Sequence, residues 1–414
     1  MTEQQVNTND LTASLLTEPV ARSSRRKLLL LLLPVSLIAV WGTLQLLRDQ
    51  VRKICHKAQA EERWVDLETW SRRWSDWQPR EADAWLMLAD AVQHQNRFLE
   101  AAEYLDHVPL DSPKAAAALL LESQILFGPA NRPLDGEVVC RKLLAIEPNA
   151  TNAHAYLIRF YAYTLQRSKL EVQVKDAIRL NQEPRDAYIY YFLADSLNMA
   201  GGEQMNTLWL ASRPDEELFL VARALQSLSR EENDNESPPV PTQDHVLNPR
   251  ESLVLRMLER FPNNVNLLAD QIDAEIVKGR VDRVRELLAQ APAEAESDNR
   301  FWRTKGWIHY SKREFSDAEQ AYRVALQIHP MDWQSLTRLA EVLRARQQTA
   351  EITRIQELVK RIQTLRSEIR KVEAVENVSL QLLRNLCTLA RDCGDHVIAN
   401  ALERRLGPAN GAQP

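Results

Sequence analysis

The chain has 414 residues, of which 45% are hydrophobic, and its 52 basic and 57 acidic side chains leave a formal net charge of -5. Only 10 residues are glycine, which supplies the positive φ angles of tight turns and phosphate-binding loops. This composition disfavours sheet-rich folds and nucleotide-binding loops, and the balanced charge lacks the concentrated basic face that nucleic-acid binding requires. Because Ala, Leu, Glu, Arg and Gln are strong helix formers and are plentiful here, we predict an all-α protein.

The N-terminal region contains one long apolar segment. Residues 1–27 are largely polar and are predicted to form a disordered tail. Residues 28–47, LLLLLLPVSLIAVWGTLQLL, carry no charge. A helix of that length spans roughly 30 Å, the thickness of the hydrocarbon core of a bilayer. We therefore predict a single N-terminal transmembrane helix over 28–47, with a cleaved signal peptide and a buried core helix as the alternatives.

Basic residues flank this segment on both sides. Those before it are Arg22, Arg25, Arg26 and Lys27, and those after it are Arg48, Arg52, Lys53 and Lys57. The two flanks nearly balance, but the first cluster directly abuts the apolar run. On the positive-inside rule we expect the short tail inside and the bulk of the chain on the extracytoplasmic side of the membrane.

After the apolar segment, prolines that close helical segments recur with a period near 34 residues. They are Pro79, Pro113, Pro148, Pro184, Pro262 and Pro330. Between them, apolar residues recur at helical spacing, as in the run Trp85, Leu88 and Val92. Self-similarity at this period indicates a stack of helical repeats.

The stretch 301–330, FWRTKGWIHYSKREFSDAEQAYRVALQIHP, shows the repeat most clearly. The residues at the diagnostic spacings are Trp302, Gly306, Ala318, Tyr322, Ala325 and Pro330. This stretch resembles a tetratricopeptide repeat (TPR), although Lys305 and His309 stand where Leu and Tyr are usual. The resemblance implies a right-handed superhelical solenoid of helix–turn–helix repeats, in two arrays over 58–228 and 250–346.

The remaining segments differ in composition from the repeats. Residues 229–249 are acidic, polar and proline-rich, and are predicted to form a flexible linker or insertion. Residues 347–407 are predicted to contain a long charged helix, roughly 349–374, followed by two helices that cap the array. A disordered tail over 408–414 completes the organisation.

The sequence contains none of the common catalytic motifs: no phosphate-binding loop, no dinucleotide fingerprint, no H-E-x-x-H and no G-x-S-x-G. Cys387, Cys393 and His396 form the best candidate for a metal site, but their spacing is wider than zinc sites usually show. We therefore predict no metal, no cofactor and no enzymatic activity. An enzyme with a divergent active site stays as a third hypothesis.

Several aromatic and histidine residues invite two interpretations. Trp70, Trp74 and Trp77 share one helical face, which either packs against the first repeat or forms a partner-binding or membrane-surface patch. His309 occupies a packing position of the repeat, and His329, before the closing proline, is expected to be exposed.

The TPR resemblance also implies a concave groove that binds extended peptides or helices of other proteins. In that family the groove is lined by first-helix residues outside the consensus packing positions. Here these are Arg159, Tyr163, Asp195, Asn198, Arg300, Arg303, Trp307 and Tyr310. The last four form the most partner-like group, because guanidinium and aromatic side chains suit acidic or C-terminal peptides. The alternative is that all eight are solvated surface residues.

These observations predict a membrane-tethered, non-catalytic scaffold that binds a partner protein or peptide in the groove and binds no nucleic acid. The alternative is an accessory assembly subunit of a membrane or envelope enzyme complex. The two differ in stoichiometry, because a dedicated subunit has one partner at a fixed ratio.

Overall fold

The computed structural model describes residues 42, 45–195, 201–234, 249–372 and 377–407, and these residues form helices and turns but no strand. The predicted all-α class is therefore confirmed for them. The chain divides into two compact units, Met1–Asn96 and Arg97–Pro414, which are described separately.

Most of the predicted transmembrane segment, 28–41 and 43–44, lies outside the described residues, as do the predicted tails 1–27 and 408–414. Among the helices that the structure describes, none combines the length and the apolar character needed to cross a bilayer. The transmembrane helix thus stays a prediction.

The first unit packs three helices around a small core. Residues 45–60 are helical and are followed by α2 (Trp64–Trp77) and α3 (Ala82–Gln93). Cys55, Ala58 and Leu67 are fully buried in this core together with Trp74. Trp70 packs against the same core, whereas Trp77 is 43% exposed. The tryptophan face of α2 is therefore mainly a packing face, with Trp77 at its edge.

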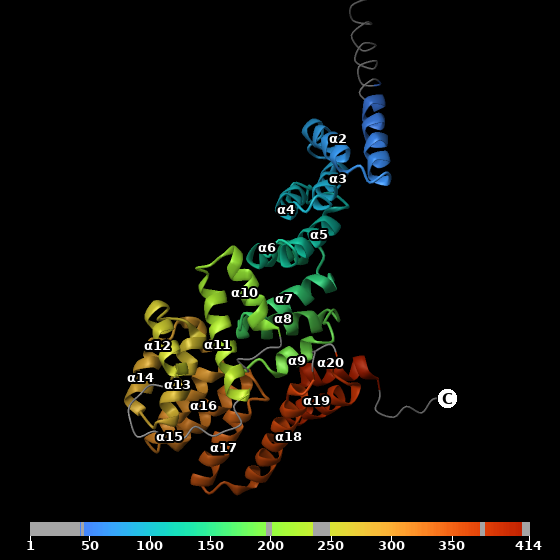
Figure 1. The fold of residues 1–414 in the computed structure, drawn as a ribbon. Helices are drawn as coiled ribbons and strands as arrows, with labels where there is room; N and C mark the ends of the chain where they lie inside the picture. Colours follow the sequence, from blue (N-terminus) through green and yellow to red (C-terminus); the bar gives the residue numbers. More distant parts are fainter. Residues whose placement is uncertain (1–41, 43–44, 196–200, 235–248, 373–376, 408–414) are drawn as a thin grey trace, which may run out of the picture. The chain divides into compact units, whose positions relative to one another are not determined.

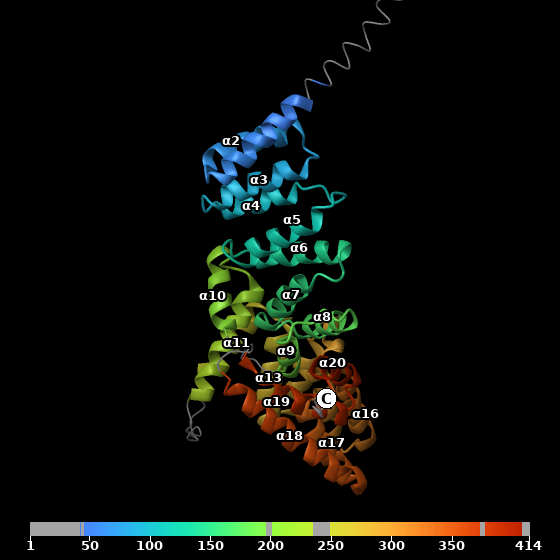
Figure 2. The same cartoon turned by 90° about the vertical axis from the view of Figure 1, so that its right-hand side faces the viewer.

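The second unit begins with consecutive helices that pack side by side (Figures 1 and 2). These are α4 (Phe98–Asp106), α5 (Ala115–Phe127), α6 (Pro133–Ile146), α7 (Thr151–Tyr163), α8 (Arg167–Arg179) and the short α9 (Ala187–Phe192). Each of these helices except α9 contacts the next one in the chain, as expected for stacked helix pairs.

The unit continues through α10 (Gly202–Ser212) and α11 (Glu217–Asp234) to α12 (Pro249–Arg260). The predicted linker 229–249 therefore overlaps the end of α11, and residues 235–248 lie outside the described part. The next helices are α13 (Val265–Val277), α14 (Val281–Ala289), α15 (Asn299–Ser311), α16 (Phe315–Ile328) and α17 (Trp333–Ala345), with the 3-10 turn η1 (Ala293–Ser297) before α15.

The last part contains the turn η2 (Thr349–Glu351), the long helix α18 (Ile352–Arg370), and the final pair α19 (Leu380–Asp392) and α20 (His396–Leu406). This pair folds back toward the middle of the chain. Helix α20 packs against α8, and the guanidinium of Arg405 donates to the carbonyl of Glu183 at 2.9 Å (Figure 1). Tyr191 on α9 donates its hydroxyl to Asp395 at 2.7 Å, which places α8 and α9 against the C-terminal helices.

A recurring hydrogen bond explains the regular spacing of aromatic residues and prolines. The indole nitrogen of Trp302 donates to the carbonyl of Glu296 at 2.9 Å, six residues earlier. The imidazole Nε2 of His154 lies 3.0 Å from the carbonyl of Pro148, again six residues earlier, and Trp85 makes the equivalent contact in the first unit. Each contact fixes the start of a repeat's first helix to the turn before it.

The crossing of paired helices depends on matching a small residue with a large one. In the α15–α16 pair, a Cβ added to Gly306 would lie 2.7 Å from the ring of Tyr322, which is fully buried. The glycine is therefore required for the close approach of the two helices. In the α5–α6 pair the large side chain is instead on the first helix: a Cβ added to Gly136 on α6 would lie 2.8 Å from the ring of Phe127 on α5.

Glu122 is a buried carboxyl without a strong ionic partner. Burial, reinforced by the charge of Asp106, raises its pKa to about 8, so that it stays protonated in the folded protein at neutral pH. In the unfolded chain the same carboxyl ionises near its ordinary pKa of 4.5. The folded state thus binds more protons than the unfolded state between these two values, and the free energy of unfolding must fall as pH rises through that range.

We predict that Glu122→Gln removes most of this pH dependence. Each unit of pKa shift corresponds to about 1.4 kcal/mol, so wild type should lose several kcal/mol of stability between pH 5 and pH 8. Urea unfolding at both pH values measures the difference. The exposed Glu147→Gln is the matched control and should follow wild type. Parallel curves for wild type and the Glu122 variant would contradict the assignment.

Candidate functional site

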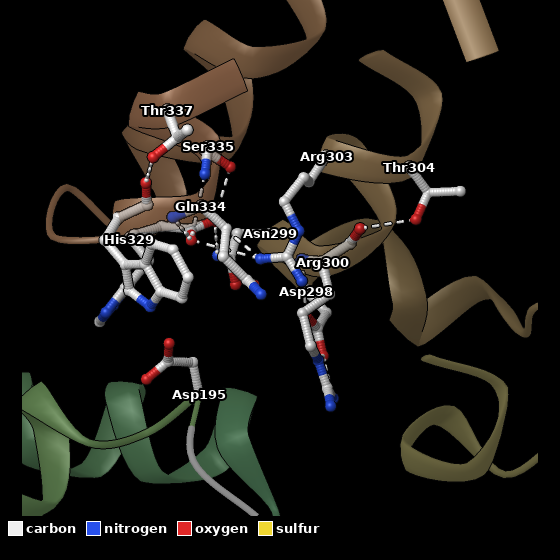
Figure 3. A network of polar contacts seen from close by, with 12 residues as sticks. Asp195, Asp298, Asn299, Arg300, Arg303, Thr304, His329, Gln334, Ser335 and Thr337 are labelled. Atoms are coloured by element: carbon white, nitrogen blue, oxygen red, sulfur yellow. Dashed lines mark hydrogen bonds and ion pairs between the residues drawn. The ribbon is translucent and has the colours of Figure 1, made fainter. Parts of the chain in front are cut away.

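Two of the four predicted groove residues on α15, Arg300 and Arg303, lie in a buried network of charged side chains (Figure 3). Helix α15 begins after Asp298, whose carboxylate accepts the backbone N–H of Arg300 at 2.9 Å and thereby caps the helix. The same carboxylate accepts three further hydrogen bonds from the guanidinium of Arg300, two from Nε at 3.1 Å and one from a terminal nitrogen at 2.6 Å. Arg300 also donates to Asn266 on α13 at 2.8 Å, so that it joins two neighbouring repeats.

A second cap in the network is Asp332, which is fully buried at the start of α17. Its carboxylate accepts the backbone N–H groups of Gln334 at 3.1 Å and Ser335 at 3.3 Å. It also accepts the side-chain amide of Asn299 at 2.6 Å and the guanidinium of Arg303 at 3.2 Å, both from α15 (Figure 3). The carboxylate of Asp332 thus caps the start of α17 and also fixes α15 to that end of the helix.

The third part of the network comes from helices far apart in the sequence. Asp195, just after α9, forms an ion pair with Arg366 on α18 at 2.5 Å. On α8, Arg167 donates to Glu171 at 3.2 Å, and the Nδ1 atom of His329 lies 3.5 Å from the same carboxylate. These contacts connect α8 and α9 with the C-terminal half of the unit.

The pKa values of these carboxyls follow from burial opposed by cations. Burial alone would raise the pKa of Asp195, but the guanidinium groups of Arg366 and Arg167 outweigh it and hold the pKa well below its usual range. The pKa of Asp298 is likewise low, because Arg300 outweighs the effect of burial. Carboxylates that stay ionised in fixed ion pairs are poorly suited to general acid–base chemistry at neutral pH.

The cysteines also lack the properties of nucleophiles. Burial raises the pKa of the Cys55 and Cys140 thiols to about 11 and that of Cys393 to about 12. The pKa of Cys387 is also raised by burial, and its thiol donates to the carbonyl of Ala399 at 3.4 Å. Thiolates, the reactive form, are therefore scarce at neutral pH.

The structure places seven of the eight predicted groove residues, and Asn198 lies outside the described part. Asp195, Arg300 and Arg303 meet in the buried network, where Arg300 and Arg303 are 8% and 7% exposed. Arg159 pairs with Asp186 at 2.9 Å, and the hydroxyl of Tyr163 lies 3.3 Å from that of Tyr190.

The remaining two predicted groove residues, Trp307 and Tyr310, are half-buried near the end of α15. Trp307 packs against the core of α13–α15, and Tyr310 lies against the ring of Phe315 at 5.7 Å between centroids. Partner binding by any of the eight stays a prediction.

Sequence analysis missed the partners that complete the network. The prediction that His329 is exposed is wrong, because this residue is fully buried between Glu171 and the ring of Tyr191. Its burial depends on α8 and α9 folding against the end of α16, more than a hundred residues away. The capping role of Asp332 had a local signal, since an acidic residue two positions after the closing Pro330 stands where a helix N-cap is expected.

One group of side chains in the described part has the composition of a metal site: His309, Glu314 and Asp317, whose ligand atoms all lie within 4.8 Å of one another. Glu314 and Asp317 are exposed at the start of α16, and Nδ1 of His309 lies 2.6 Å from Glu314. An imidazole–carboxylate contact at a helix N-terminus accounts for this arrangement without a metal ion. The sequence candidates Cys387 and His396 belong to α19 and α20.

No protein-family model and no curated protein matches the chain. Similar solved structures include a tetratricopeptide repeat protein from Parabacteroides merdae, 12% identical, with a TM-score of 0.26 over 72% of this chain and 98% of that one. The APC/C hetero-tetramer Cut9–Hcn1 is 13% identical, with a TM-score of 0.34 over 79% of this chain and 63% of that one. Yeast Tom70 is 12% identical, with a TM-score of 0.27 over 86% and 89% of the two chains.

These similarities are too distant to carry a functional argument. The chain's own helix pairs, their spacing of about 34 residues and the Gly306–Tyr322 crossing make it a TPR-like helical-repeat protein.

We predict that Arg303→Ala destabilises the protein by about 3–5 kcal/mol, because it leaves the buried carboxylate of Asp332 without its cation. Arg283→Ala is the control: Arg283 pairs with Glu286 on the surface, and its loss should cost less than about 1 kcal/mol. Urea unfolding of both variants measures the contrast. A double-mutant cycle with Asp332→Ala tests the cause, since additive effects would mean that the two side chains are not coupled.

Proposed function

We propose that this protein is a membrane-tethered, non-catalytic scaffold. Its partner protein binds to a surface formed by α13, α15 and α17, the first helices of three consecutive repeats. The observation that carries the proposal is a set of equivalent positions on the first helices of three consecutive repeats. Asp273, Trp307 and Glu341 are spaced by 34 residues each on α13, α15 and α17. Equivalent positions of stacked repeats face the same side of the array.

The next equivalent set lies one helical turn further along the same helices. Ile276, Tyr310 and Arg344 are again 34 residues apart, and Arg344 is exposed. Beside them, Val277 is 87% exposed, more than any other large hydrophobic side chain that the structure describes in this unit. Together with the first set these residues form what we call the open strip: Asp273, Ile276, Val277, Trp307, Tyr310, Glu341 and Arg344.

The open strip suits a protein ligand better than a small substrate. Its centre is aromatic and aliphatic, and charged side chains stand at its ends, which is the composition of protein interfaces. Asp273 and Glu341 lie 3.4 Å from Arg303 and 2.9 Å from Arg338 respectively, and both carboxylates stay partly exposed. The paired carboxylates and protonated thiols elsewhere in the unit favour a binding role over a catalytic one.

We predict that Trp307→Ala combined with Tyr310→Ala abolishes partner binding while the helical content is kept. A photo-crosslinking residue at position 344 should give discrete adducts in detergent extracts of the native cells, and these adducts should disappear in the double variant. Position 323 is the control site. Arg323 lies on α16, the second helix of the repeat, and is paired with Glu319 on the same helix and with Glu351 in η2. Equal adduct formation at both positions, or unchanged adducts in the double variant, would refute the open strip as the binding surface.

The stoichiometry of these adducts separates two forms of the proposal. One partner at a fixed ratio to this chain favours an accessory assembly subunit of a membrane complex. Several partners below equimolar amounts favour a scaffold. If the purified chain turned over a substrate and the Trp307 and Tyr310 variants kept that activity, the non-catalytic proposal would be wrong.

The tether rests on the apolar run 28–47. We predict that deleting residues 1–44 converts the chain from one retained by membranes in alkaline carbonate to one released into the wash. The deletion leaves helix 45–60 intact, including the buried Cys55 and Ala58 that join it to α2 and α3. If the shortened chain stays in the membrane, or the full chain is released, the run does not act as the anchor.

A further inference from the structure

The helix formed by residues 45–60 has one face that lies outside the core of the first unit. Cys55 and Ala58 point into the core of the first unit and are fully buried. On the opposite side Leu46, Gln50, Lys53 and Lys57 follow one another at i, i+4, i+7 and i+11, and all four are exposed. That spacing puts them in one stripe along the helix.

The stripe and its neighbours are basic. Between residues 45 and 60 there are four Lys or Arg residues and one acidic residue, Asp49, which gives a formal charge of 4 − 1 = +3 with His56 neutral. Arg52 is engaged with Asp83 at 2.9 Å. Lys57 lies 3.8 Å from Glu61, and both side chains are exposed, so this pair contributes little. Lys53 has no ion pair among the residues that the structure describes.

The position of the stripe along the chain identifies its partner. If the run 28–47 spans the bilayer, Lys53 and Lys57 lie roughly 9 and 15 Å beyond its end at about 1.5 Å per residue. Side chains of an α-helix lean toward its N-terminus, so both ammonium groups are directed back toward the membrane. The distance from each ammonium group to the lipid headgroups is therefore comparable to the Debye length, about 8–10 Å at physiological salt, so that their attraction is only partly screened. The exposed Leu46 and Leu47 stand at the boundary itself.

We propose that the exposed basic face of helix 45–60, with Lys53 and Lys57 at its centre, binds the anionic phospholipid headgroups of the leaflet in which the anchor ends. This inference rests on the proposed membrane tether. The contact is electrostatic: phosphate groups take the place of the acidic partners that the stripe lacks within the first unit. It orients the first unit on the bilayer surface, because the same helix is fixed by its other face to α2 and α3.

The test uses the full chain reconstituted in bilayers of equimolar phosphatidylcholine and phosphatidylglycerol. Lipids retained by the protein after mild detergent extraction are counted by mass spectrometry. We expect phosphatidylglycerol to be enriched, by about fivefold for each lysine, the ratio equivalent to about 1 kcal/mol per basic residue near an anionic surface. Lys53→Gln with Lys57→Gln should remove the enrichment due to these two lysines and leave only the share from the basic cluster before the apolar run. For wild type, 0.5 M salt should bring the ratio close to one.

The control variant carries Lys312→Gln and Lys371→Gln, two exposed lysines of the second unit, and should keep the wild-type ratio. A chain that withstands a carbonate wash but retains both lipids equally overturns the headgroup contact and leaves the tether standing. An enrichment that is unchanged in the Lys53 and Lys57 variant also overturns it. A chain that is washed out of the bilayers overturns the tether, and with it this inference.

Discussion

The packing of the C-terminal repeats depends on the contacts of one buried carboxylate, that of Asp332. It caps α17, receives the amide of Asn299 and the guanidinium of Arg303 from α15, and has no access to water. A charge in that position is tolerated only because every one of its oxygens is occupied by donors, one of them a full cation. Since the same groups join two consecutive repeats, the position of α15 against α17 follows from satisfying one carboxylate. The ion pair of Asp195 with Arg366 applies the same principle between segments 171 residues apart.

Apolar packing alone would stack these repeats without fixing which segments meet. The Gly306–Tyr322 and Gly136–Phe127 crossings show two solutions to the same steric problem, in which a glycine on one helix leaves space for an aromatic ring on its partner. Such crossings set the distance between paired helices. The buried ion pairs add direction, because a guanidinium and a carboxylate in a dry interior are stable only in a matched geometry. We infer that the return of α18 and α20 onto α8 and α9 owes its specificity to these polar contacts.

The sequence was sufficient for the features that are local. The spacing of Trp302, Gly306, Tyr322 and Pro330 predicted the helix pair α15–α16 within a few residues, because each of those residues acts on its own helix or on the next. The predicted long helix, roughly 349–374, and the two capping helices after it correspond to α18 and to the pair α19–α20. The buried state of His329 had no local signal, since it is produced by Glu171 on α8 and Tyr191 on α9, which reach it only in the folded unit. Arg303 is buried by Asp273 and Asp332, each about thirty residues away along the chain. Arg300 differs, because its counter-ion Asp298 stands only two residues earlier, where an acidic N-cap of α15 is a local signal.

The internal pairing of Arg300 and Arg303 changes how a partner would be recognised. The half of α15 nearest its N-terminus is occupied by a cap and ion pairs, so only the half toward the C-terminus, with Trp307 and Tyr310, remains available to a ligand. Binding there would gain its free energy from aromatic and aliphatic burial, with charges at the rim for orientation. A contact of helix 45–60 with lipid would be electrostatic and sensitive to salt, whereas the open strip would be far less so. The two proposed surfaces can therefore be separated by ionic strength alone, because they depend on different forces.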